Sequence, residues 1–185
     1  NGGFGAVPIG AGFTGASGGS GGTGGVHCEC AVTMTNCEIT GTIGGQGRDA
    51  GFGNIESANG GNGAAAGLVI VSTGSSTIVG TLIAQNIAGD GGHGSPDNEG
   101  SGRGGHGGSA GLIVENGQCY IASTTIADNI LGSGAIGYPT SVAAYQGVDG
   151  HAGIVAKSCA VTISDSIVWF NGPVPLKSLD AAATF

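Results

Sequence analysis

The sequence has few charges and no long apolar run. Charged residues make up 9% of the 185 residues, against about 25% in a typical soluble domain. The four cations lie singly along the chain: Arg48, Arg103, Lys157 and Lys177. Such scattered cations cannot follow a phosphate backbone or hold an anionic lipid surface, so we expect no nucleic-acid or acidic-membrane partner. No apolar run approaches the roughly 18 residues that a membrane-spanning helix needs, so we expect no membrane-spanning helix.

Catalytic motifs are also missing: there is no G-x-S-x-G elbow, phosphate-binding loop or H-E-x-x-H pair. The one polar constellation is GDGGHGSPDNEGSGRGGHGG (89–108), which contains Asp90, Asp97 and Glu99. These carboxylates are candidate Ca²⁺ ligands, because calcium binds oxygen. Alternatively they could serve a carbohydrate-degrading site, which needs clustered carboxylates, or form the solvated tip of a glycine-rich arm. We favour the tip, and predict no enzyme activity and no required cofactor.

Glycine is abundant, with 43 residues, and it marks a repeat. Four times a glycine opens an apolar run, at Gly25, Gly67, Gly111 and Gly153. A second strand-like run follows each opening: VTMTNCEITGTI (32–43), STIVGTLIAQN (76–86), YIASTTIADN (120–129) and VTISDSIVWFN (161–171). These runs are rich in Val, Ile and Thr, as strands are. Short strands repeated in register predict an all-β solenoid of about four coils, in which equivalent residues stack as parallel ladders.

The last three strand-like runs end in Asn86, Asn129 and Asn171, which lie 19, 18 and 18 residues after their opening glycines. Asparagine tolerates a left-handed turn, and its side chain can bond the copy in the next coil. We therefore predict an asparagine ladder at a turn; the alternative is three unrelated loop starts.

The segments between coils have a period of three. Glycines fall at 102, 105, 108 and 111, and similar series precede the first and fourth openings. A polyproline-II helix has three residues per turn, so such glycines line one bare edge along which neighbouring helices can approach. We predict arms that form a bundle of glycine helices beside the solenoid; the alternative is flexible Gly/Ser linkers.

These coils and glycine-rich loops resemble the right-handed parallel β-helix repeats of bacterial surface and secreted proteins, over roughly residues 24–172. The resemblance implies a right-handed β-helix and a surface, adhesive or passenger role, although some such proteins are polysaccharide lyases or hydrolases. The period of three also resembles small glycine-rich antifreeze proteins. We accordingly expect a single solenoid domain over 1–172 and a C-terminal tail over 173–185.

Five cysteines cannot all pair within one chain. Cys119 and Cys159 follow their opening glycines by eight and six residues, and are the first candidate disulfide. Cys37 with Cys28 or Cys30 is the second, and buried free thiols are the alternative. Low charge and scarce lysine favour an oxidising, extracellular or cell-surface location. The start at Asn1 indicates a processed N-terminus or a piece of a longer protein.

A stack of four coils exposes strand edges at both ends. Pro173 and Pro175 break the strand pattern, and the tail that contains Leu179 and Phe185 could pack on its own coils or on a neighbouring copy. We therefore expect a structural subunit that assembles with itself into a filament or surface layer. The alternatives are a glycan-binding or adhesive module, a polysaccharide-degrading enzyme, and an ice-binding protein with a row at Thr81, Thr125 and Ser166.

Overall fold

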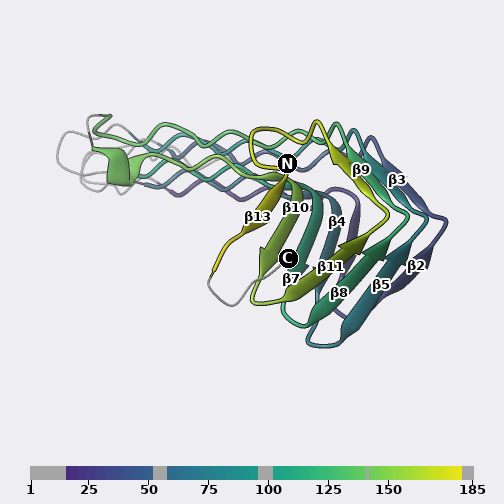
Figure 1. Cartoon of the computed structure of the whole chain (residues 1–185). Helices are drawn as coiled ribbons and strands as arrows, with labels where there is room; N and C mark the ends of the chain where they lie inside the picture. The colour runs from purple at the N-terminus through teal and green to yellow at the C-terminus, as the bar shows by residue number, and fades with distance from the viewer. Residues whose placement is uncertain (1–15, 52–57, 96–101, 141, 181–185) are drawn as a thin grey trace.

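The computed structural model describes residues 16–51, 58–95, 102–140 and 142–180, and its strands form three parallel sheets (Figure 1). Sheet A has the order β1 (Val26–Cys28), β4 (Ala66–Val71), β7 (Ala110–Glu115), β10 (Ala152–Lys157) and β13 (Leu176–Ser178). Sheet B has the order β11 (Ala160–Ser164), β8 (Gln118–Ala122), β5 (Ser75–Val79) and β2 (Thr33–Thr35). Sheet C has the order β12 (Ile167–Trp169), β9 (Thr125–Ala127), β6 (Leu82–Ala84) and β3 (Glu38–Thr40). The predicted all-β fold of stacked parallel strands is confirmed.

Each repeat gives one strand to each sheet, and we call these three strands a coil: β1–β3, β4–β6, β7–β9 and β10–β12 are coils 1 to 4. The corner between sheets B and C falls on a residue with positive φ in every coil: Asn36, Gly80, Ser123 and Asp165. A positive φ turns the chain out of the extended conformation. Each strand-like run of the sequence is therefore split into two strands rather than one.

The opening glycines occupy equivalent places, since Gly67 pairs with Gly111 and Gly111 with Gly153. Their φ angles of 92°, 94° and 95° are open to glycine and strained for other residues. The close approach of each glycine to a carbonyl on the neighbouring strand adds a second reason: a Cβ on Gly67 would overlap the Gly111 oxygen, and one on Gly153 would overlap the Pro175 oxygen. The sequence needs glycine at each opening for both reasons.

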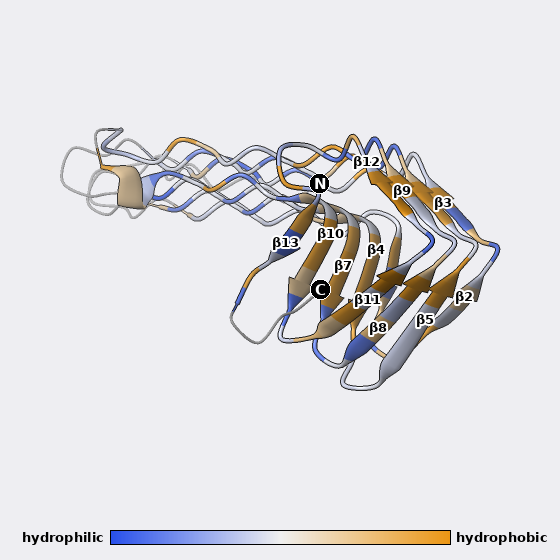
Figure 2. Ribbon diagram, viewed as in Figure 1, coloured by the Kyte–Doolittle hydropathy of each residue, from blue (hydrophilic) through white to orange (hydrophobic). Residues whose placement is uncertain are grey.

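The core is a cluster of buried, mostly aliphatic side chains that come from all three sheets. Most of the strands that supply them are coloured as hydrophobic in Figure 2. Coils 2 and 3, with Ile154 of coil 4, supply its fully buried centre: Leu68, Ile70, Ile78, Ile83, Leu112, Val114, Ile121, Ile126 and Ile154. Burial of each such side chain contributes about 1.5–3 kcal/mol. In sheets B and C these residues alternate with more exposed ones, whereas in sheet A the alternate positions Val69, Ile113 and Val155 are also buried, in a second apolar cluster.

The glycine-rich segments leave the coils between sheets C and A and run side by side as a bundle (Figure 1). We call the described residues 44–51 and 58–65 the first arm, 88–95 and 102–109 the second arm, and 131–140 and 142–151 the third arm. The two stretches of each arm are its outgoing and returning halves, and η1 (Ala143–Tyr145) lies in the third arm. Their glycines face neighbouring backbone. A Cβ on Gly105 would overlap the Gly61 oxygen, and one on Gly108 would overlap the Ala64 oxygen. Within the described residues these segments are packed arms and not loose linkers.

Successive N–H groups of an arm donate to three different neighbours. In the second arm, Gly107 N donates to Val148 O at 2.9 Å, and Gly108 N to Gly89 O at 2.8 Å. The preceding N–H, that of His106, donates to Asn62 Oδ1 at 2.9 Å. In each three-residue turn, the three backbone N–H groups therefore point in three directions and each finds an acceptor. The N–H that points outward from the bundle is accepted by a side chain.

Candidate functional site

The three predicted ladder asparagines form a continuous buried row. Asn86 Nδ2 donates to Asn129 Oδ1 at 2.9 Å, and Asn129 Nδ2 donates to Asn171 Oδ1 at 2.7 Å. The same oxygens accept the backbone N–H of the preceding coil, at 3.1 Å for Asn86 and 3.2 Å for Asn129. In coil 1, Thr42 takes this place and donates its hydroxyl to Asn86 Oδ1 at 2.8 Å. Each amide therefore joins two coils at the exit to the arms.

A second row of side chains lies at the corner between sheets B and C. Thr81 N donates to Thr124 Oγ1 at 3.3 Å, and Thr124 N donates to Ser166 Oγ at 3.1 Å. The row expected for ice binding is wrong in two respects. It contains Thr124 in place of Thr125, and Thr81 and Thr124 are buried and not on a flat exposed face.

The shift of one residue, from the expected Thr125 to the observed Thr124, has a local cause. Three residues connect β4 to β5 in coil 2, at 72–74, whereas two connect β7 to β8 in coil 3, at 116–117. The extra residue lies in the corner between sheets A and B and leaves the ladders beyond it in register. It also explains why Asn86 lies 19 residues after its opening glycine and Asn129 only 18.

The outer faces of the arm bundle carry a lattice of side-chain acceptors that the sequence analysis missed. A backbone N–H that points outward from one arm donates to a side chain on the preceding arm, at 2.7–3.1 Å. The pairs, acceptor first, are Asp49 with His93, Asn59 with Arg103, Asn62 with His106, Asp90 with Ser133, His93 with Ile136, His106 with Val148, and Ser109 with His151. A shared interval of 42–44 residues is the only signal in the sequence.

The candidate calcium ligands are only partly within the described residues. Asp90 lies on the second arm, and its Oδ1 accepts the N–H of Ser133 at 2.7 Å; Asp97 and Glu99 lie outside the described residues. Across the described ranges no three His, Cys, Asp or Glu side chains gather in a metal-binding group. Asp90 therefore acts in the acceptor lattice.

All five cysteines are free thiols, so neither expected disulfide is present. The ladder pairs Cys119 with Val161, two residues beyond Cys159. Cys159 lies at the preceding corner, where its Sγ donates to Val114 O at 3.3 Å. Burial raises the pKa of Cys119 to about 12, with a further rise from Cys159, and burial also raises the pKa of Cys159.

In coil 1 the candidate disulfide partners lie on different parts of the coil. Cys28 is on β1, opposite Ile70. Cys37 lies between β2 and β3, and its Sγ donates to Thr35 O at 3.5 Å.

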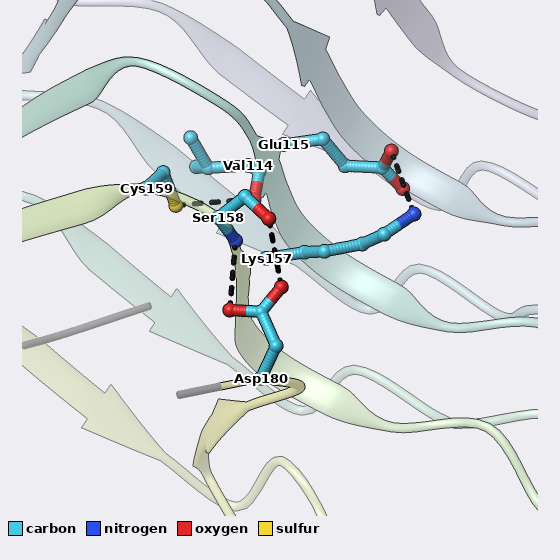
Figure 3. A network of polar contacts seen from close by, with 6 residues as sticks. All are labelled: Val114, Glu115, Lys157, Ser158, Cys159 and Asp180. Carbon is cyan, nitrogen blue, oxygen red and sulfur yellow. Dashed lines mark hydrogen bonds and ion pairs between the residues drawn. The ribbon is translucent and has the colours of Figure 1, made fainter. Parts of the chain in front are cut away.

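The tail contributes a strand to its own coils. β13 pairs with β10, with Leu176 opposite Ile154. Asp180 then holds the corner after β10: it accepts Ser158 N at 3.1 Å and Ser158 Oγ at 2.8 Å (Figure 3). Nearby, Lys157 lies 3.4 Å from Glu115 in an exposed ion pair (Figure 3). Leu179 is exposed beyond β13, and Phe185 lies outside the described residues.

The C-terminal end of the stack has an open, apolar surface. We define the end surface as Ile167 and Trp169, on the outer face of the last strand β12, and Phe170 after it, which are 60%, 62% and 72% exposed. The rings of Trp169 and Phe170 meet edge to face with centroids 5.1 Å apart. Among the described residues no strand covers β11 or β12 on this side, whereas β13 covers β10.

The core is also open at this end. Ile163 and Val168 point into the core cluster but are only partly buried. Their counterparts one coil earlier, Ile121 and Ile126, are 0% and 1% exposed. The difference is the covering that a further coil would provide.

The last arm, by contrast, is closed on its outer edge. Gly134 N donates to Asp149 Oδ1 at 2.8 Å, and Gly137 N donates to Gln146 Oε1 at 3.2 Å. Gln146 also returns a bond from Nε2 to Gly137 O at 3.0 Å. These side chains take the place of a further arm, so the bundle offers few free donors at this edge.

No protein-family model, curated protein or solved structure matches this chain. No helix among the described residues is long and apolar enough to cross a membrane.

Proposed function

We propose that this protein is a structural subunit that assembles with copies of itself outside the cell or on its surface. The proposal takes the coils as a right-handed parallel β-helix and the arms as helices of the polyglycine-II type. It includes no catalytic role and no cofactor. Low charge and scarce lysine support the extracellular location.

The observation that carries the proposal is the open end of sheets B and C. β11 and β12 present unpaired backbone edges within the described structure, and edges of this kind recruit further strands. Beside them lie exposed Ile167, Trp169 and Phe170. Aromatic and aliphatic side chains around an open edge are typical of surfaces that another protein covers.

The covered parts of the same end restrict how copies can meet. β13 occupies the edge of sheet A, and Asp149 and Gln146 close the edge of the arm bundle. The contact therefore centres on β11, β12 and the end surface. A copy that stacked coil 1 evenly on coil 4 would meet β13 first, so assembly requires a stepped contact.

Sedimentation velocity over a wide range of protein concentration tests the proposal, with electron microscopy of the assembled fraction. We expect the sedimentation coefficient to rise with concentration. The variant Ile167→Lys places a charge on the end surface and should keep the protein monomeric. Ile130→Lys is the matched control, because Ile130 is 55% exposed but lies at the base of the arms. A wild-type monomer at every concentration contradicts the proposal.

Glycan binding is the second candidate function, and the outer face of sheet B favours it. Thr33, Thr77, Tyr120 and Thr162 form one outward row across the four coils. Tyr120 is 44% exposed, and its hydroxyl lies 3.1 Å from Ser164 Oγ. Regularly spaced hydroxyls beside an aromatic ring suit a sugar with a polar edge and an apolar face. Binding to a glycan array that Tyr120→Ala abolishes supports this role; the absence of wild-type binding contradicts it.

A further inference from the structure

Two members of the acceptor lattice are histidines. Ile136 N donates to His93 Nδ1 at 3.1 Å, and Val148 N donates to His106 Nδ1 at 3.0 Å. Both imidazoles are exposed on the arm bundle. A ring nitrogen accepts a hydrogen bond only when it carries no proton, so both bonds require the neutral imidazole.

Both histidine bonds lie at the same joint. His93 is on the outgoing half of the second arm and His106 on its returning half, and their donors lie on the two halves of the third arm. The joint between the first and second arms is built differently. There Asp49, Asn59 and Asn62 accept the corresponding N–H groups, and these side chains keep acceptor oxygens in weak acid.

The charged groups around the two histidines are few. Asp49 accepts the backbone N–H of His93, and Arg48 and Asp90 line the same shallow hollow. Around His106, Asn62 on the first arm and Val148 on the third carry no charge. Arg103 lies one turn away on the same arm.

The carboxylate nearest to Val148 in the chain is that of Asp149, which accepts the N–H of Gly134.

We propose that protonation of His93 and His106 loosens the third arm from the second while the first and second arms stay joined. The proton turns each Nδ1 from an acceptor into a donor that faces another N–H donor. The bond is lost and the two donors repel. The backbone bonds between the arms, such as Gly107 N to Val148 O, remain and keep the third arm attached. The device thus changes the order of one arm without unfolding the coils.

Amide hydrogen exchange measured by NMR tests this at single residues. We expect the protection factors of the Ile136 and Val148 amides, corrected for intrinsic exchange, to fall about fivefold between about pH 7.5 and about pH 5. Fivefold is the ratio for the ~1 kcal/mol of one neutral hydrogen bond. The amides of His93, Arg103 and His106, which Asp49, Asn59 and Asn62 accept, should keep their protection.

The double variant His93→Asn/His106→Asn supplies the decisive control, because Asn59 and Asn62 already fill equivalent places. It should keep the two bonds and lose their pH dependence. The reciprocal change Asn62→His should make the amide of His106 acid-sensitive. The proposal is overturned if wild-type protection at Ile136 and Val148 is the same at both pH values, or if the pH dependence persists in the double variant.

Discussion

Replacing Asn129 by alanine tests whether the asparagine ladder holds the coils together. Its side chain is 2% exposed and makes four bonds. Oδ1 accepts from Asn86 N and Asn86 Nδ2, at 3.1 Å and 2.9 Å. Nδ2 donates to Ile83 O and Asn171 Oδ1, at 3.1 Å and 2.7 Å. Alanine removes all four at the centre of the ladder.

The cost follows from which partners keep another bond. Asn86 Nδ2 still donates to Ile39 O, and Asn171 Oδ1 still accepts Asn129 N. The N–H of Asn86 loses its acceptor in a buried place, which costs about 1–3 kcal/mol. With the other lost bonds and the space left by the amide, we expect unfolding to become easier by about 2–5 kcal/mol. That is a large part of a typical stability of about 5–15 kcal/mol.

Urea unfolding followed by far-ultraviolet circular dichroism measures this cost through the shift of the midpoint at constant slope. Asn59→Ala is the matched control: the same truncation removes one bond, to Arg103 N at 2.9 Å, from an exposed residue. Water can replace that acceptor at the surface, so the control should lose at most the ~1 kcal/mol of one neutral hydrogen bond. Equal costs for the two variants would refute the assignment of a stabilising role to the ladder.

Three further predictions concern the arms, the pH response and the thiols. Gly105→Ala should lower the free energy of unfolding by at least about 1–3 kcal/mol, because the new Cβ would overlap backbone atoms. Gly22→Ala should change it little, since no atom lies within 4 Å of its Cβ position, and urea midpoints measure both variants. Burial lowers the pKa of His151, so the unfolded chain binds a proton at this residue more readily than the folded chain does. The free energy of unfolding should therefore fall as the pH falls through the imidazole range. His151→Gln should flatten this pH dependence, and an unchanged slope would contradict the prediction. Iodoacetamide should label exposed Cys30 in the native protein, but Cys119, with its pKa near 12, only after unfolding, as peptide mass mapping would show.

The repeat was readable in the sequence because each coil needs the same residue types in the same places. Gly67, Gly111 and Gly153 recur since each combines a positive φ with close contact to the backbone of the neighbouring strand. Asn86 and Asn129 recur because one amide can both donate and accept between coils. Such requirements are local, so they leave a signal at a regular interval even without a structure.

The register across the coils could not be derived from that interval. One additional residue at 72–74 shifts everything after it, and composition does not show at which corner it lies. The expected Cys119–Cys159 disulfide failed for a related reason: the two cysteines lie at different positions of their coils, and the structure pairs Cys119 with Val161. The position of the tail strand was equally open, because its pairing with β10 depends on how far the chain travels after Asn171.

The acceptor lattice explains how a glycine-rich arm can be ordered. Each ordered glycine costs more backbone entropy than any other residue, and it buries no side chain in return. An arm triplet such as 106–108 compensates by satisfying all three N–H groups, two through backbone carbonyls and one through Asn62. The outward residue therefore needs a short side chain with an acceptor, and Asp, Asn, Ser or neutral His each meets that need. Because four chemically different residues meet one requirement, the lattice leaves no motif in the sequence, and only the pairing of arms reveals it.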